Sequence, residues 1–341
     1  MQERDLFSAI DLHSNNNYLT VIDSTDHRLF EKRLKNDLSV VLGSLDPFKN
    51  RVAAVAVEST FNWYWLVDGL NQAGYSTCLV NTSKVSQYEG LKHSDDRHDA
   101  FWLAHLMRLG ILPTGYIHPP EHRALRDLLR KRMRLVQQRT MNILGVQNLQ
   151  QRNTGVRMST DQIKAQSIDT IAESELNPNR ALSLRTTQAI ILALDEQIKS
   201  IEKAVFRQVR PDPAWKLLKS VWGIGDVLAT TIRLESGELS RFVSVGNYVS
   251  YCRCVKAERL SNGKIKGENN KKNGNQYLAW AFIEAANFAI RDYKVARRWF
   301  ERKAAKTNPI LARKALAHKL ARASFWVMRE GVRFDSDRLF R

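Results

Sequence analysis

Four acidic residues near the amino terminus have types and positions that suit phosphodiester chemistry. Asp11 lies inside the apolar run "SAIDL", where an unpaired carboxylate would be costly to bury. Glu58 ends the apolar run "VAAVAVE", and Asp96 and Asp99 lie three residues apart, on one face of a helix. Converging carboxylates repel each other unless divalent cations bind, and two Mg²⁺ ions held by shared carboxylates can bracket a scissile phosphate. The four residues therefore predict a magnesium site.

Each of these acids also has a plainer interpretation. Asp96 and Asp99 could form a solvated helix face, and Glu58 could cap a helix that follows its strand. Asp95 is adjacent to Asp96, but the three-residue spacing to Asp99 selects Asp96. Asp11 is harder to explain in this way, because its immediate neighbours are apolar.

The predicted elements before residue 116 would bring the four acids together. Strands are expected at residues 6–12, 18–24, 28–34, 51–60 and 75–81, and helices at 37–46, 61–74 and 95–109. This order predicts a mixed α/β domain of the ribonuclease-H type over residues 1–115. In such a sheet the first and fourth strands are neighbours and the last helix crosses their ends, so the carboxylates would converge.

The middle of the chain, residues 116–209, has a helical and more basic sequence pattern. The break "IHPPEH" precedes a basic helical stretch, and a second helix carries a heptad seam. The seam steps by three and four residues through Ile191, Leu194, Ile198, Ile201 and Val205. We expect an antiparallel coiled-coil arm that also serves dimerisation. A single amphipathic hairpin packed on its own domain fits the same pattern.

The last part, residues 210–341, is expected to be mainly helical. Its segment "SVWGIGDVLATTI" resembles a helix-hairpin-helix, whose turn meets a phosphate, although a plain helix–helix turn fits equally. Ser261 lies in a Ser-Asn-Gly turn, and on local pattern alone this is turn chemistry rather than a nucleophile. Basic residues suited to phosphate contact lie in two places. The loop around Ser261 carries Arg259, Lys264, Lys266, Lys271 and Lys272, and the basic helical stretch of the middle segment carries Arg126 and Arg130. A solvated surface loop is the alternative for the loop residues.

Net charge supports a polyanionic partner. The chain carries 53 Lys and Arg against 35 Asp and Glu, a net charge of +18. Residues 1–115 are slightly acidic, with 11 basic and 14 acidic residues, whereas residues 208–341 carry 27 against 12. Nucleic acid is therefore the expected partner rather than a membrane. The chain has neither a signal-peptide pattern nor a long apolar run, so a cytoplasmic protein is expected. The Cys252-x-Cys254 pair lacks two further ligands at zinc spacing.

Six segments together resemble one known family. "AIDLH", "VAVEST" and "SDDRHDA" resemble the acidic motifs of DEDD transposases with a RuvC-like domain. "SVWGIGDVLATTI", "ERLSNGKIKG" and "KKNGNQYLAWAFIEAANFA" resemble the carboxy-terminal transposase domain of the same family. These are the bridge-RNA-guided recombinases of bacterial insertion sequences, relatives of the pilin-gene invertase. The resemblance covers essentially the whole chain in order; Cys252-Arg253-Cys254 stands where many members have a Gly-Leu pair.

The resemblance implies a function that the residues alone do not give. Asp11, Glu58, Asp96 and Asp99 would bind Mg²⁺, and Ser261 would attack DNA to form a covalent phosphoserine. A structured guide RNA would pair with donor and target DNA, and the protein would act as a homodimer or homotetramer. Two rival functions stay open: a RuvC-type Holliday-junction nuclease that uses water as the nucleophile, and an inactive nucleic-acid-binding relative.

Overall fold

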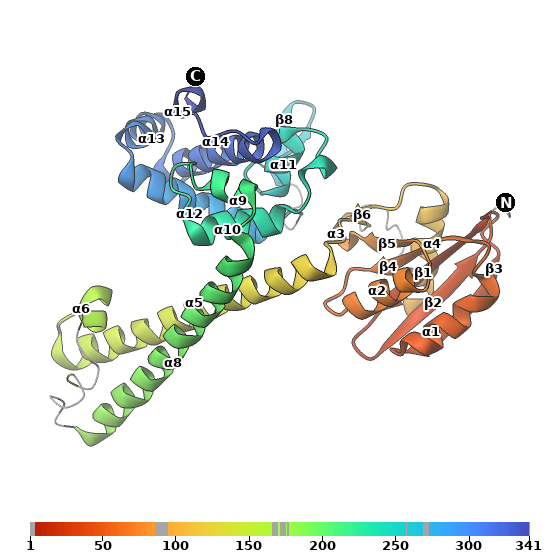
Figure 1. Cartoon of the computed structure of the whole chain (residues 1–341), viewed down its shortest axis with the longest axis horizontal. Coiled ribbons are helices and arrows are strands. Elements are labelled where there is room, and N and C mark those ends of the chain that lie inside the picture. Colours follow the sequence, from red (N-terminus) through yellow and green to blue (C-terminus); the bar gives the residue numbers. More distant parts are fainter. Residues whose placement is uncertain are drawn as a thin grey trace. The chain divides into compact units, whose positions relative to one another are not determined.

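The computed structural model of the chain describes residues 4–85, 95–165, 170, 175, 177–256, 258–268 and 273–340. The chain divides into two compact units, residues 1–117 and 118–341 (Figure 1). The predicted division of the second unit, into an arm that ends at residue 209 and a separate domain that begins at 210, stays a prediction.

The first unit is built on a six-stranded mixed sheet in the order β3-β2-β1-β4-β5-β6. Strands β1, β2 and β3 form an antiparallel meander, β1, β4 and β5 run parallel, and β6 is antiparallel to β5. The strands are β1 Leu6–Leu12, β2 Asn16–Ile22, β3 Arg28–Lys35, β4 Val52–Glu58, β5 Thr77–Val80 and β6 Thr114–Gly115. The predicted mixed α/β domain is therefore confirmed, and it is consistent with a RuvC-like fold.

Helices cover both faces of this sheet because the central strands are apolar on both sides. Helices α1 (Leu38–Leu45) and α2 (Tyr64–Gln72) pack with Ile10 and Val57 in one hydrophobic cluster. Helix α4 (Asp96–Arg108) packs with Ala9 and Ala56 in another. The short helices η1 (Asp46–Phe48) and α3 (Thr82–Val85) complete the unit. Odd positions of β1 and even positions of β4 therefore lie on the α4 face.

The second unit begins with two long helices that pack against each other, α5 (Pro120–Thr154) and α8 (Pro178–Val209). Ile143, Val146, Leu184 and Ile191 are buried between them, together with Ile163 of α6 (Thr160–Ala165). The predicted pair of long helices is thus present, and its assignment as a coiled-coil arm stays a prediction.

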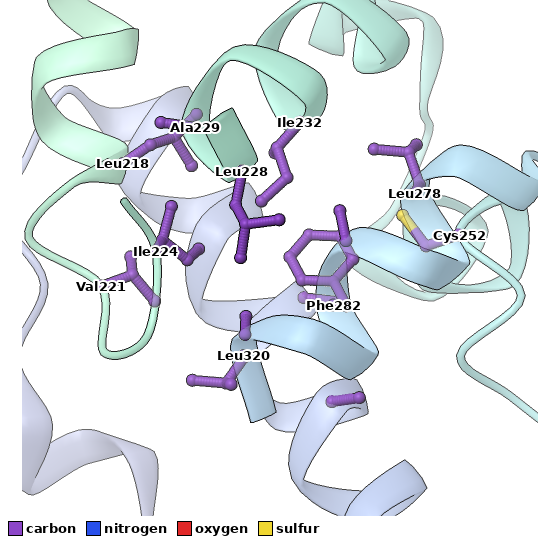
Figure 2. Packing of buried hydrophobic residues seen from close by; sticks show 14 of the residues in the cluster. Leu218, Val221, Ile224, Leu228, Ala229, Ile232, Cys252, Leu278, Phe282 and Leu320 are labelled. Carbon is purple, nitrogen blue, oxygen red and sulfur yellow. The ribbon is translucent and has the colours of Figure 1, made fainter. Parts of the chain in front are cut away.

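The rest of the second unit is mostly helical, as predicted. Its core gathers residues from α9, α10, α12 and α14 around Phe282 (Figure 2). A small hairpin interrupts the helices. The elements are α9 Pro213–Leu218, α10 Asp226–Ser236, η3 Leu239–Arg241, α11 Val245–Tyr251, β7 Glu258–Ser261, β8 Lys264–Glu268, α12 Gln276–Asp292, α13 Lys294–Lys306, α14 Pro309–Glu330 and α15 Ser336–Leu339. None of the helices in the described ranges is long and apolar enough to cross a membrane.

The Gly-x-Gly of the sequence, Gly223 and Gly225, lies in the turn between α9 and α10, which packs against α12. Gly223 has a positive φ of 77°, and a Cβ placed there would lie 2.1 Å from the carbonyl oxygen of Ala285 on α12. Gly225 has an ordinary φ of −91° and open space around it. Only the first glycine is therefore required by the contact with α12.

Gly223→Ala is expected to lower the free energy of unfolding by at least about 2 kcal/mol. Alanine disfavours the positive φ, and its Cβ would clash with the carbonyl oxygen of Ala285. Urea unfolding followed by circular dichroism measures the change. Gly225→Ala is the matched control and should cost only a few tenths of a kcal/mol, as expected at a helix N-cap. Equal effects of the two substitutions would contradict this account of the turn.

Candidate metal centre

Asp11 is the buried acid on which the site is built. Ile10 pairs with Val57 across the parallel β1–β4 ladder, so the next residues along, Asp11 and Glu58, lie side by side at the strand ends. Both fall on the sheet face that α4 covers. Asp11 is 3 % exposed, and its Oδ2 atom has no hydrogen-bond partner among the described residues. A carboxylate at such a depth is costly unless positive charge or strong hydrogen-bond donors lie against it.

His13 joins the site although the sequence interpretation gave it no role. Its Nε2 atom lies 3.2 Å from Asp11 Oδ2 and 3.2 Å from Asp96 Oδ1. The side chains of Asn36 and Asn62 each donate a hydrogen bond to the His13 carbonyl oxygen at 2.9 Å and fix the backbone there. The spacing Asp-x-His could have indicated it, since residues two apart on an extended chain share one face.

The first turn of α4 supplies the other two acids. Asp95 is the N-cap of the helix, and its Oδ1 accepts a 2.8 Å hydrogen bond from the amide of His98. Asp96 and Asp99 follow in the first turn, where the helix dipole favours negative charge. The structure therefore gives Asp95 a capping role and brings Asp96 to the centre.

Glu58 is half-buried next to Asp11. Burial, followed by a hydrogen bond to Asp11 and the charges of Asp11 and Asp99, raises the pKa of Glu58 to about 8. Glu58 does not cap the following helix, since α2 begins at Tyr64 and has no side-chain cap. Glu58, Asp11 and Asp99 thus influence one another at one end of the sheet, and Asp96 joins them through His13.

These residues fit a divalent cation. Ligand atoms of Asp11, His13 and Asp96 all lie within 4.8 Å of one another, the one such group in the described part of the chain. Glu58 and Asp99 adjoin this group without belonging to it. Carboxylate oxygens suit Mg²⁺ and Mn²⁺, and an imidazole suits Mn²⁺ and other transition metals. The donor set and the burial of the Asp11 carboxylate together support a metal centre; they do not select Mg²⁺.

The raised pKa of Glu58 predicts a pH dependence of the metal-free protein. Between about pH 4.5 and about pH 8 the folded protein keeps a proton on Glu58 that the unfolded chain loses. The free energy of unfolding should therefore fall as pH rises through this window. Urea unfolding in a chelator measures it, and Glu58→Gln should flatten the slope. Parallel pH profiles of the two proteins would contradict this assignment.

Two transposase families match segments of the chain. Residues 9–151 match the transposase family named for the DEDD motif and IS110, and residues 215–300 match a second model, the transposase IS116/IS110/IS902 family. The two segments together cover more than half of the chain. The chain carries the transposase domains of the IS110/IS116 family.

Relatives with curated descriptions extend over nearly the whole length. The transposase is 22 % identical over 353 aligned residues to the 44.8 kDa protein of insertion element IS116 from Streptomyces clavuligerus, covering 86 % of this chain and 88 % of the relative. It is 21 % identical over 343 residues to the transposase for insertion sequence element IS1328 from Yersinia enterocolitica, covering 96 % and 98 %. Together with the two family matches, these relatives identify the chain as an insertion-sequence transposase.

Ser261 of the transposase lies in the second unit, at the end of β7. It pairs with Lys264 across a two-residue turn, in which Asn262 and Gly263 have φ values of 50° and 71°. Two consecutive positive φ angles make the tight hairpin turn that Asn-Gly favours. The Ser261 side chain is exposed. The turn thus displays a hydroxyl at the tip of a hairpin.

The cations predicted to contact nucleic acid around the hairpin are only partly described. Lys264 and Lys266 lie on β8 with exposed side chains. Arg259 lies on β7, and the structure describes its backbone position alone. Lys271 and Lys272 lie outside the described residues. Phosphate contact by these residues stays a prediction.

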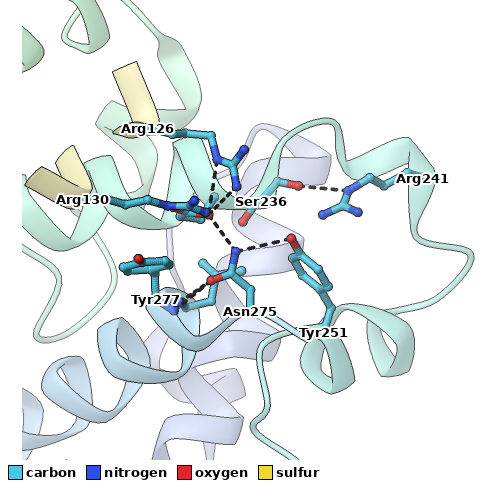
Figure 3. Close-up of polar contacts among 9 residues, drawn as sticks. Arg126, Arg130, Ser236, Arg241, Tyr251, Asn275 and Tyr277 are labelled. Carbon is cyan, nitrogen blue, oxygen red and sulfur yellow. Dashed lines mark hydrogen bonds and ion pairs between the residues drawn. The ribbon is translucent and has the colours of Figure 1, made fainter. Parts of the chain in front are cut away.

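Arg126 and Arg130 occupy a different environment from the one expected. Both reach from α5 to the buried carboxylate of Glu235 on α10 (Figure 3). The Arg126 side chain is 9 % exposed and donates to Oε2 at 2.8 Å, while Arg130 donates to Oε1 at 2.7 Å. Asn275, the N-cap of α12, donates to the same carboxylate at 2.7 Å. The Nε and Nη2 groups of Arg126 are thus used inside the protein. Phosphate contact by Arg126 and Arg130 stays a prediction.

Glu235 is expected to be a stability residue. Burial alone would raise its pKa, but the hydrogen bonds and charges of Arg130 and Arg126 outweigh burial and lower it. Glu235→Ala would leave buried guanidinium groups uncompensated, so we expect a loss of about 3–5 kcal/mol in urea unfolding near neutral pH. Because the pKa is lowered, this contribution is present above the ordinary pKa of 4.5 and is lost as pH falls below it.

The control for this substitution is a more exposed pair of the same kind. Glu202 accepts hydrogen bonds from Arg132 at 2.9 and 2.7 Å between α8 and α5, with 27 % of its side chain exposed. Glu202→Ala should cost no more than about 1 kcal/mol. A cost for Glu235→Ala as small as that of the control would contradict the proposed role of Glu235.

Proposed function

We propose that this insertion-sequence transposase is an RNA-guided DNA recombinase that cuts and rejoins DNA through a covalent phosphoserine at Ser261. The observation that carries the proposal is the convergence of Asp11, His13 and Asp96 with Glu58 and Asp99. The serine step is supported by the resemblance of "ERLSNGKIKG" to the family's motif, in which Ser261 matches the serine that attacks DNA.

The metal centre would act on the phosphate. Asp11, Asp96 and His13 would hold the cation, with Glu58 and Asp99 beside it. A bound Mg²⁺ there would neutralise charge on the phosphate oxygens and favour attack. Glu58 would release its proton when the cation binds, since a ligand carboxylate must be ionised.

The exposed Ser261 hydroxyl would supply the nucleophile. Its oxygen forms a bond to phosphorus, the phosphodiester bond to one strand end breaks, and that end leaves as a hydroxyl. The reverse attack, by a hydroxyl from the other DNA, restores Ser261 and joins the new strands. Each exchange conserves one phosphoester bond, so ligation needs no nucleotide cofactor.

Guide RNA and assembly complete the proposal. Sequence choice would come from pairing of a structured RNA with donor and target DNA, while the basic second unit follows the backbones. The paired α5 and α8 helices would carry homodimer and homotetramer contacts.

A reconstituted reaction tests this function. Donor DNA, target DNA, Mg²⁺ and the RNA transcribed beside the gene should yield recombinant DNA, and omission of either the RNA or the metal should abolish it. Recombination without RNA would contradict guidance. Cleavage of four-way junctions without any adduct would favour the junction nuclease. Binding without cleavage under every condition would favour an inactive relative.

A further inference from the structure

Helix α13 carries an exposed row of positive charge to which the proposed function gives no specific contact. Six of its thirteen residues are basic and exposed, against one acid, Glu301. Ala296 and Trp299 instead contribute to the hydrophobic core. The basic residues are Lys294, Arg297, Arg298, Arg302, Lys303 and Lys306.

Four of these cations stand at intervals of four residues. Lys294, Arg298, Arg302 and Lys306 therefore follow one row along the helix, over a length of about 18 Å. A single small anion needs one or two cations at one place. A row of this length matches a polymer with closely and regularly spaced charges, such as a nucleic-acid backbone.

A pocket adjoins this row where α12, α13 and α14 meet. Its volume is about 360 Å³, and it is lined by Asn287, Ile290, Arg291, Arg297, Phe300, Glu301 and Arg313. Three guanidinium groups against one carboxylate give the lining a net positive charge. Phe300 contributes a ring beside the guanidinium of Arg313, at 6.0 Å.

The three arginines of the pocket are not equally available. Arg297 donates to the carbonyl oxygens of Ile290 and Arg291 at 3.0 and 2.6 Å, at the end of α12. Arg291 donates two hydrogen bonds to the carboxylate of Asp292, at 2.6 and 2.9 Å. The Nε atom of Arg313 is buried and has no hydrogen-bond partner within the part of the chain that the structure describes. Arg313 is therefore the guanidinium best placed to bind a ligand.

We propose that the α13 row and the adjoining pocket bind the phosphodiester backbone of a nucleic acid, with Arg313 donating to a phosphate in the pocket. A guanidinium suits this task because its planar donors match two phosphate oxygens. The inference rests on the proposed function only in taking nucleic acid as the polyanion. It adds a binding surface on α13 and α14, separate from the hairpin of Ser261.

Fluorescence anisotropy of the full chain, without metal, tests this surface with labelled duplex DNA and a labelled RNA single strand between about 50 and 200 mM salt. Arg313→Gln should reduce the slope of log Kd against log salt by about 0.9 for a duplex or about 0.7 for a single strand. Arg298→Gln combined with Arg302→Gln should reduce it by about twice as much. These two residues are exposed, so the double variant carries the test if Arg313→Gln does not fold.

Lys32→Gln combined with Arg33→Gln, on β3 of the first unit, removes the same charge and should leave both slopes unchanged. A reduced slope with one polymer alone identifies that polymer as the ligand, and a reduced slope with both assigns the surface to backbones in general. Unchanged slopes with both polymers would overturn the proposal, as would displacement of the polymer by inorganic phosphate at equal phosphate concentration. If the slopes change as expected but the wild-type protein does not recombine DNA in the reconstituted reaction, that result counts against the proposed function alone.

Discussion

Ser261→Ala is expected to reduce recombination and the covalent protein–DNA adduct by roughly 10⁴-fold or more, because in the proposed reaction the Ser261 oxygen forms the bond to phosphorus. The substitution removes one exposed hydroxyl at the end of β7 and leaves the Asn262-Gly263 turn in place. Thermal stability and nucleic-acid affinity should therefore stay close to wild type. Adduct formation is measured by a gel shift of labelled donor DNA that survives denaturation.

Ser250→Ala is the control for the serine. Ser250 is an exposed residue of α11 in the same unit, and its loss should change neither the adduct nor the recombinant product. If Ser261→Ala still cleaves DNA hydrolytically at the wild-type rate, water is the nucleophile and the junction-nuclease function is favoured instead.

Asp11→Asn is expected to lower the rate of DNA cleavage by roughly 10³-fold or more, since it removes the most buried charge of the metal centre while keeping the side-chain shape. The metal-dependent rise in melting temperature should disappear with it, which gives a readout that is independent of catalysis. RNA binding should be retained, because the first unit carries none of the proposed backbone contacts.

Asp46→Asn provides the matched substitution outside the site. Asp46 lies in η1 with an exposed side chain, and its amide variant should keep both cleavage and the metal-dependent shift. Full-rate cleavage by Asp11→Asn, or a metal-dependent shift equal to wild type, would contradict a metal centre built on Asp11.

The fold of the first unit follows from local sequence pattern to a large degree. The apolar runs of β1 and β4 indicate strands buried on both faces, and a polar Asp95 before an amphipathic run indicates the start of α4. Position in such a sheet then places Asp11 beside Glu58, because neighbouring parallel strands end at one edge. Residues on regular elements were predictable for this reason.

Contacts between segments far apart in the chain were not predictable in the same way. Arg126 and Arg130 look like solvated cations on a basic helix, and only the tertiary structure brings Glu235, over a hundred residues later, against them. His13 was missed for a related reason: its role depends on Asp96, which comes from another element. The turn at Gly223 likewise acquires its meaning only from Ala285 on α12.

The most direct test of the account is to identify the amino acid joined to DNA. The reconstituted complex would be trapped during the reaction, digested with nuclease and protease, and the modified peptide sequenced by mass spectrometry. The account predicts a nucleotide-bearing phosphoserine at Ser261, formed only with a divalent cation and lost in Asp11→Asn. A modification at any other residue, or complete strand cleavage with no modified peptide, would contradict it.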